Sequence, residues 1–211
     1  MGLGRWYEEK VLPRIIGAGC GSAEVTELRR KVVPLARGAV FEIGCGGGFN
    51  QQLYDPQAVS SFAGLDPNPA LLDAARARAA EKGWAADIRQ GAAEAIPFAD
   101  ASFDTVVCTY TLCSVDDQAR ALAEMRRVLK PGGALLYLEH GRAPDAGPRK
   151  WQQRIEPAWK KLMGNCHLTR EVGGAIAPAG FTLHPAGQDY FAGAPRWASW
   201  MEWGTAVKAG D

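Results

Sequence analysis

No apolar run in the 211-residue chain approaches the about 20 residues that a membrane-spanning helix needs. Charged residues and proline, such as Glu8, Lys10 and Pro13, interrupt the first residues, where a signal peptide needs an unbroken apolar core. The five cysteines are odd in number and include no C-x-x-C pair, which argues against a disulfide framework and against a zinc site. We therefore expect a soluble, unprocessed, cytoplasmic protein without a metal site.

A surplus of charge of either sign is also absent. The 24 lysines and arginines against 23 acidic residues give a formal net charge of +1. A protein that binds nucleic acid by neutralising phosphates needs a basic surplus or a dense basic stripe, so we predict no nucleic-acid partner. Apolar residues at 47% and charged residues at 22% are typical of an ordinary globular domain and exclude a disordered chain.

Short apolar segments bounded by turn residues alternate with helical patterns along the chain. The segments 39–43, 61–66, 85–90, 103–109 and 134–139 are predicted strands. Asn68 and Pro69 predict the start of a helix that ends near Glu81, and Asp116 or Asp117 predicts a second helix that Pro131-Gly132-Gly133 ends. Alternation of this kind predicts an α/β fold with a parallel sheet and helices on both faces.

The C-terminal part offers two more strand-like segments, 181–183 and 200–207, with no helix predicted between them. They suit an antiparallel hairpin that completes the sheet. We therefore predict a Rossmann-like, seven-stranded, mostly parallel sheet with an antiparallel C-terminal hairpin. In open sheets of this kind, ligands bind at the carboxyl ends of the strands, where the strand order reverses.

The N-terminal residues have helical rather than strand periodicity. Apolar side chains predict an amphipathic helix over 3–16, ended by Gly17 and Gly19, and a second helix from Ser22 to before Pro34. We interpret residues 1–36 as a helical lid and 37–211 as the ligand-binding domain. An insertion, 141–180, lies between predicted strands, and we expect it to cover the end of the sheet at which the substrate binds.

A glycine-rich loop follows the first predicted strand, in the sequence Glu42-Ile43-Gly44-Cys45-Gly46-Gly47-Gly48. A dinucleotide-binding loop G-x-G-x-x-G/A needs a small residue at position 49, and Phe49 occupies that position, which argues against NAD and FAD. Such a loop suits a ligand without a pyrophosphate. Asp66 ends the second strand, where a carboxylate can accept hydrogen bonds from both hydroxyls of a ribose. The alternative is that Asp66 only caps the following helix.

Several motifs in a fixed order together resemble class I S-adenosylmethionine-dependent methyltransferases with a methyltransferase type 11 domain. They are Glu42-x-Gly44-x-Gly46-x-Gly48, Asp66, Ala93-Glu94, Phe103-Asp104-x-Val106 and Leu129-Lys130-Pro131-Gly132-Gly133. The segments 108–115, 139–140 and 165–171 are further similar to the methyltransferase-like thiol S-methyltransferases and their bacterial relatives. The resemblance implies S-adenosylmethionine as cofactor, held by these residues: Glu42, Gly44, Cys45, Gly46, Gly48, Asp66, Pro67, Ala93, Glu94 and Thr109.

Animal members of that family begin with a hydrophobic membrane anchor, whereas this chain has the amphipathic segment 3–16. Two interpretations of that segment are open. It folds over the cofactor as a lid, or it lies in a membrane interface. Because the acidic residues Glu8 and Glu9 offset the basic residues around them, we expect at most weak contact with a membrane surface.

Methyl transfer needs alignment, desolvation and an acceptor in the right protonation state. The resemblance implies a small, fairly apolar thiol as acceptor; an amine, a phospholipid headgroup, or binding without turnover are the alternatives. His140 is the candidate base and Tyr110 the candidate wall of the acceptor pocket, with His167 as a second candidate base; both histidines could equally be structural. A thiol acceptor makes a base dispensable, because part of it is already thiolate at neutral pH.

Three further groups have a plain structural interpretation. Cys108 and Cys113 are expected to be small buried side chains. The basic run Arg126, Arg127 and Lys130 is expected at a solvated helix end. Tryptophans 151 and 159 either pack on the sheet or line the acceptor pocket.

Overall fold

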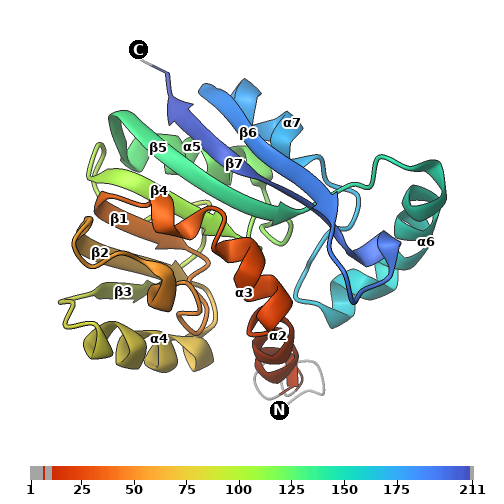
Figure 1. The fold of residues 1–211 in the computed structure, drawn as a ribbon, viewed down its shortest axis with the longest axis horizontal. Coiled ribbons are helices and arrows are strands. Elements are labelled where there is room, and N and C mark those ends of the chain that lie inside the picture. Colours follow the sequence, from red (N-terminus) through yellow and green to blue (C-terminus); the bar gives the residue numbers. More distant parts are fainter. Residues whose placement is uncertain (1–6, 8–10, 210–211) are drawn as a thin grey trace.

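A seven-stranded sheet forms the centre of the protein, whose computed structural model describes residue 7 and residues 11–209 (Figure 1). β1 to β5 run parallel, and β7 pairs antiparallel with β5 and β6. The order across the sheet is β3-β2-β1-β4-β5-β7-β6. This confirms the predicted fold and the C-terminal hairpin. The strands are β1 Gly38–Ile43, β2 Val59–Asp66, β3 Asp87–Gln90, β4 Phe103–Thr109, β5 Leu129–His140, β6 Phe181–Tyr190 and β7 Trp200–Lys208.

Helices cover both faces of the sheet, because successive residues of its buried strands point to opposite sides. Phe41 and Val106 pack with α5 and α7 on one face. Their neighbours Val40 and Val107 pack with α3 and α4 on the other face. α6 lies beyond the end of the sheet (Figure 1). The helices are α2 Leu12–Cys20, α3 Ala23–Arg29, α4 Pro69–Glu81, α5 Gln118–Val128, α6 Ala146–Leu162 and α7 Val172–Ile176.

Three helices start at a side chain that caps them as the sequence predicts. Asn68 accepts a hydrogen bond from the N–H of Ala70 at the start of α4. Asp117, rather than Asp116, caps α5. Ser22 accepts from the N–H of Val25 and caps α3. Each of these caps satisfies a backbone donor that has no partner within its helix.

α2 differs from the prediction at its C-terminal end. The prediction that Gly17 and Gly19 end the first helix is wrong, because α2 continues to Cys20, and Gly21 N donates to Gly17 O at 3.0 Å. Glycine costs only about 1 kcal/mol inside a helix, so packing of the helix on the rest of the molecule can outweigh it. Of the predicted segment 3–16, residues 1–6 and 8–10 lie outside the described part.

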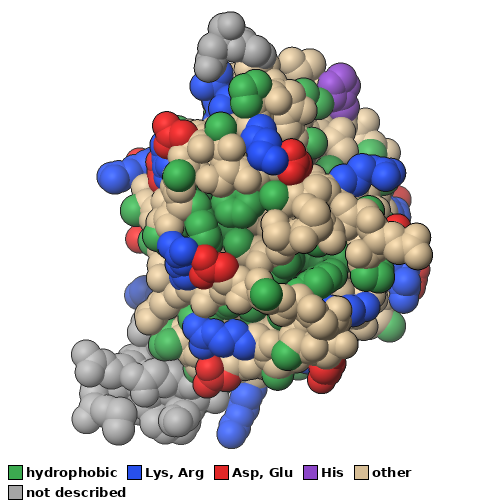
Figure 2. All heavy atoms as spheres, turned by 90° about the vertical axis from the view of Figure 1, so that its left-hand side faces the viewer, with side chains coloured by type: hydrophobic (Ala, Val, Ile, Leu, Met, Phe, Trp, Pro, Cys, Tyr) green, Lys and Arg blue, Asp and Glu red, His purple; other side chains and the backbone are tan. Residues whose placement is uncertain are grey.

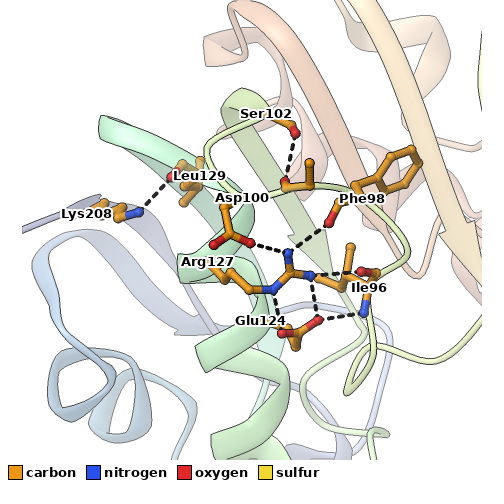
Figure 3. A network of polar contacts seen from close by, with 9 residues as sticks. Ile96, Phe98, Asp100, Ser102, Glu124, Arg127, Leu129 and Lys208 are labelled. Atoms are coloured by element: carbon orange, nitrogen blue, oxygen red, sulfur yellow. Dashed lines mark hydrogen bonds and ion pairs between the residues drawn. The ribbon is translucent and has the colours of Figure 1, made fainter.

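β5 begins earlier than predicted. Pro131-Gly132-Gly133 does not end α5; the helix stops at Val128 and the strand starts at Leu129, opposite Phe103. The ladder with β4 is irregular before Ala134, and Lys208 Nζ on β7 donates to Leu129 O at 2.8 Å (Figure 3). Residues distant in sequence therefore hold this part of the strand in place. A short 3-10 turn, Arg196–Ala198, also lies between β6 and β7, where no helix was predicted.

Arg127 is not merely a solvated residue at a helix end. Its guanidinium binds the carboxylate of Glu124, Asp100 Oδ1 at 2.7 Å, and the carbonyl oxygens of Ile96 and Phe98 at 2.8 Å each (Figure 3). These bonds tie α5 to the loop that precedes β4. Lys130 likewise binds both carboxylate oxygens of Asp104 at 2.8 Å. Arg127 thus fixes a loop and Lys130 joins β5 to β4, in contrast to the predicted solvated helix end.

The face of the molecule that Figure 2 shows carries basic and acidic side chains interspersed, in keeping with the near balance of charge. Among the helices that the structure describes, none has both the length and the apolar character needed to cross a membrane.

Candidate active site

A cavity of about 750 Å³ lies at the carboxyl ends of β1, β2, β4 and β5. Helices α2 and α3 contribute to one wall, and residues of the segments 159–166 and 191–201 contribute to another. The predicted site residues that line it are Glu42, Gly44, Cys45, Gly46, Asp66, Pro67, Ala93, Glu94, Thr109, Tyr110 and His140. Gly48 is the exception, because it packs against Gln51 and Ala75 beneath the loop.

The glycine-rich loop has the backbone that only glycine adopts easily. Gly44 has φ +66° and Gly46 has φ +48°. A Cβ on Gly44 would lie 2.0 Å from Thr111 Oγ1, so no side chain is tolerated there. The loop therefore presents bare backbone to the cavity.

Asp66 joins the second strand to this loop. Its Oδ2 accepts from the N–H of Gly46 at 2.9 Å, and its Oδ1 accepts from the N–H of Asn68 at 2.8 Å. Burial raises the pKa of Asp66, and these two hydrogen bonds oppose the shift. The alternative interpretation, in which Asp66 only caps the following helix, is wrong. Asn68 is the cap of α4, and Asp66 binds the N–H of Asn68 and also lines the cavity.

Glu42 is a buried carboxylate held on both oxygens. Tyr54 Oη donates to Oε2 at 2.8 Å, and Asn50 Nδ2 donates to Oε1 at 3.0 Å. Burial raises the pKa of Glu42 to about 7, and the bond from Tyr54 and the nearby Arg29 guanidinium oppose that shift. Asn50 Nδ2 also donates to Thr109 Oγ1 at 3.0 Å, so one amide links the ends of β1 and β4.

Glu94 has a structural task besides lining the cavity. Its Oε1 accepts from the N–H groups of Asp116 and Asp117, at 2.8 and 3.0 Å. The carboxylate therefore fixes the loop after β3 against the start of α5. Ala93 next to it is small and buried, and it lines the cavity together with Leu65.

A second group of residues that line the cavity consists of His140, Cys113 and Cys166. Cys166 Sγ lies 3.8 Å from His140 Nδ1 and 3.7 Å from Cys113 Sγ. The hydrogen bond with Cys113 and then His140 lower the pKa of Cys166, although burial opposes them. His140 Nε2 is buried without a hydrogen-bond partner in the described part of the chain. The role of His140 as the candidate base stays a prediction.

Tyr110 has an unusual backbone conformation. It has φ +56°, a left-handed conformation that is uncommon outside glycine and is often found at functional sites. Its N–H donates to Leu138 O at 2.9 Å, and its ring lies under the guanidinium of Arg29, 5.2 Å away. Tyr110 thus lines the cavity, and its role as a wall of the acceptor pocket stays a prediction.

Other candidates lie elsewhere. His167 does not line the cavity; its Nδ1 pairs with Glu156 Oε1 at 3.6 Å. Cys108 is fully buried beside Glu139. Cys113 is also buried, as expected, but it belongs to the cavity wall. Of the two tryptophans on α6, Trp159 lines the cavity and Trp151 is 54% exposed, so Trp151 neither packs on the sheet nor lines the pocket.

Sequence reasoning missed Arg29, Asn50 and Cys166 as residues of the site. Arg29 sits on a helix of ordinary amphipathic pattern, and only tertiary packing brings it to the glycine loop. Asn50 directly follows Phe49 in that loop, and this proximity was an available signal. Cys166 lay in the segment 165–171 that carried the family resemblance, next to the histidine that was considered instead.

The arrangement fits the donor that the resemblance implies. Asp66 offers a carboxylate for ribose hydroxyls, the loop offers bare backbone for the amino-acid end, and Leu65, Leu71 and Ala93 offer apolar walls for a base. These groups line the same cavity as Tyr110 and His140. Donor and acceptor can therefore meet inside one space that is mostly apolar.

Comparison with known proteins points in the same direction. Residues 41–137 match the family described as a methyltransferase domain. The thiol S-methyltransferase TMT1B of Rattus norvegicus is 38% identical over 147 residues, which cover 68% of this chain and 59% of that protein. The thiol S-methyltransferase TMT1A of Homo sapiens is 37% identical over 153 residues, 71% of this chain and 62% of that protein. The chain thus spans about three fifths of the length of these curated relatives.

Among solved structures, the YcgJ protein of Bacillus subtilis superposes with a TM-score of 0.71 at 18% sequence identity. The superposition covers 88% of this chain and 98% of that one. At this identity the likeness concerns the fold, which it extends beyond residues 41–137 to most of the chain.

Proposed function

We propose, from the match of residues 41–137 to the methyltransferase domain, that the chain transfers the methyl group of S-adenosylmethionine to a small, fairly apolar thiol. One observation carries the proposal. The glycine loop and Asp66, which suit the donor, open into the same cavity as His140, Tyr110 and Trp159, which suit an apolar acceptor. The identity of about 38% to thiol S-methyltransferases supports a thiol among the possible acceptors.

S-Adenosylmethionine, when bound, supplies a sulfonium methyl for in-line displacement. The protein's own residues then have three tasks. Asp66 accepts hydrogen bonds from the ribose hydroxyls and fixes the adenosine part. Glu42, through Asn50 and Thr109, keeps the ends of β1 and β4 at a fixed distance. The apolar walls exclude water, so that alignment and desolvation account for most of the acceleration.

A thiol acceptor fits a cavity whose walls, taken as a whole, are mostly apolar. Because a thiol has an ordinary pKa near 8.5, a few per cent of it is thiolate at neutral pH, and no strong base is needed. For acceptor molecules that are still thiols, His140 Nε2 can accept the thiol proton. Tyr110 and Trp159 shape the pocket around the acceptor. An amine acceptor, by contrast, would depend more strongly on a base.

The N-terminal helices belong to this proposal as a lid, residues 1–36. Leu12, Ile15, Cys20 and Arg29 on α2 and α3 line the cavity. Ile15 is still more than a third exposed, so α2 covers the cavity without closing it. Movement of α2 would admit ligands and exclude water in turn.

The test is a screen with methyl-labelled S-adenosylmethionine over thiols, amines, phenols and phospholipids. We expect label on small apolar thiols and, with Asp66→Ala as the matched control, very little label. Transfer to amines or phospholipids in preference to thiols contradicts the thiol assignment. Binding of the donor without transfer to any of these classes contradicts the enzymatic one.

A further inference from the structure

We infer that Arg29 binds the carboxylate of the donor's methionine moiety, and that α3 thereby contributes to donor recognition. The inference rests on the proposed function and adds a donor-binding residue from outside the methyltransferase domain, 41–137. Arg29 ends α3 and lines the cavity beside the glycine loop. The helix that carries it precedes the first strand of the sheet.

The side chain of Arg29 is fixed in place but not fully used. It is 4% exposed, its Nη1 donates to Cys20 O, and its guanidinium lies over the rings of Phe49 and Tyr110, at 5.7 and 5.2 Å from their centroids. Its Nε is buried and has no hydrogen-bond partner among the described residues. A buried guanidinium N–H without an acceptor is costly, so this site is built for an acceptor that comes from outside the chain.

The charge of the cavity indicates what that acceptor is. Four carboxylates line it, those of Glu42, Asp66, Glu94 and Asp116, whereas Arg29 is its single arginine or lysine in the part of the chain that the structure describes. Arg29 forms no ion pair with a carboxylate of the described residues; the nearby Glu42 is held instead by Tyr54 and Asn50. Among the groups of an α-amino acid, a guanidinium selects the carboxylate.

An unpartnered acceptor lies beside the same loop. Asn50 is 1% exposed, and its Oδ1 is buried with no hydrogen-bond partner within the described residues, although its Nδ2 is used twice. Asn50 directly follows Phe49, whose ring lies under Arg29. One free donor on α3, Arg29 Nε, and one free acceptor next to the loop, Asn50 Oδ1, thus match the carboxylate and the ammonium of the methionine moiety.

The experiment compares two ligands that differ only in the carboxylate, S-adenosylhomocysteine and its decarboxylated analogue, by calorimetry. In the wild type the first should bind more tightly. In Arg29→Met its affinity should fall about ten- to hundred-fold, which is the effect of losing a charge-assisted hydrogen bond. The affinity for the decarboxylated analogue should stay within about two-fold. Arg29→Lys, which keeps the charge but not the planar fork, should lie between wild type and Arg29→Met.

Arg30→Met is the matched control, because Arg30 is the next residue, is exposed and pairs only with Glu27 among the described residues. It should leave both affinities unchanged. Thermal unfolding followed by circular dichroism establishes that each variant is folded. Equal weakening of both ligands in Arg29→Met, or no weakening of either, overturns the assignment. Failure of the wild type to bind S-adenosylhomocysteine overturns the proposed function itself, and with it this inference.

Discussion

Asp66 accepts a hydrogen bond from the backbone N–H of Gly46, with 2.9 Å between Oδ2 and the nitrogen. The carboxylate therefore both orders the loop and faces the cavity. Asp66→Ala should weaken binding of S-adenosylmethionine about ten- to hundred-fold, because charge-assisted hydrogen bonds to the ribose are lost. Calorimetry measures this. NAD should not bind to the wild type, because of Phe49; equal donor binding by a folded Asp66→Ala variant contradicts the cofactor site.

Glu42 should make stability depend on pH. Its folded-state pKa is raised to about 7 by burial, above the ordinary value of 4.5. The folded state thus binds the proton more tightly, and the stability it contributes is fully present below about pH 4.5 and lost as pH rises through about 7. This amounts to on the order of 3 kcal/mol.

The Glu42→Gln variant isolates that effect. Its free energy of unfolding, relative to wild type, should increase by about 3 kcal/mol between about pH 4 and about pH 8, as measured by denaturant titration. A difference that does not change with pH would show that Glu42 has the same pKa in the folded and unfolded states.

His140 should be dispensable for an acidic thiol. We expect kcat/KM to rise with the thiolate fraction of the acceptor and to level off above the acceptor's own pKa. His140→Ala should retain most activity with a low-pKa thiol and lose more with a high-pKa thiol. Loss of transfer to both, in a folded variant that still binds the donor, would establish an essential base.

Cys166 should be the most reactive thiol. Its pKa is lowered by Cys113 and His140, whereas burial raises the pKa of Cys20 and Cys45. Iodoacetamide at about pH 6 should modify Cys166 first, as mass spectrometry of peptides can show, and a bound thiol acceptor should protect it. His140→Ala should slow the reaction. Faster modification of Cys20, which also lines the cavity, contradicts this order of pKa values.

The lid should matter in plain buffer. Deletion of residues 1–16 removes Leu12 and Ile15 from the cavity wall, and we expect weaker donor binding and lower activity without liposomes. The double variant Leu12→Ser and Ile15→Ser should reproduce part of the loss with the chain intact. Full activity in buffer together with lost sedimentation with liposomes would favour the membrane interpretation.

Local signals predicted the elements whose ends are set by neighbours in sequence. Asn68 and Pro69 predicted the start of α4, and the short apolar segments that contain Phe41 and Val106 predicted buried strands. The first residues of β5 could not be predicted this way. Leu129 pairs with Phe103 and accepts a hydrogen bond from Lys208, and both partners are distant in sequence. Local propensity favours a turn at Pro131-Gly132-Gly133, and long-range pairing overrides it.

The candidate site divides in the same manner. The glycines, Asp66 and His140 follow predicted strands, and strand ends in a parallel sheet meet at one edge, so their meeting was predictable. Arg29 was not, because a helix position says nothing about which loop it will cover. The pairing of Cys113 with Cys166 depends on how the segment after α6 returns to the sheet, which has no local signal.

The walls of the cavity come from opposite ends of the chain, residues 12–29 on one side and residues 191–201 on another. Opening of either segment exposes the same interior. A ligand that contacts both segments stabilises the state in which both line the cavity, so its binding free energy is added to the cost of opening each of them. The ligand thereby couples the two segments thermodynamically, so that opening of residues 12–29 and opening of residues 191–201 each cost its binding free energy.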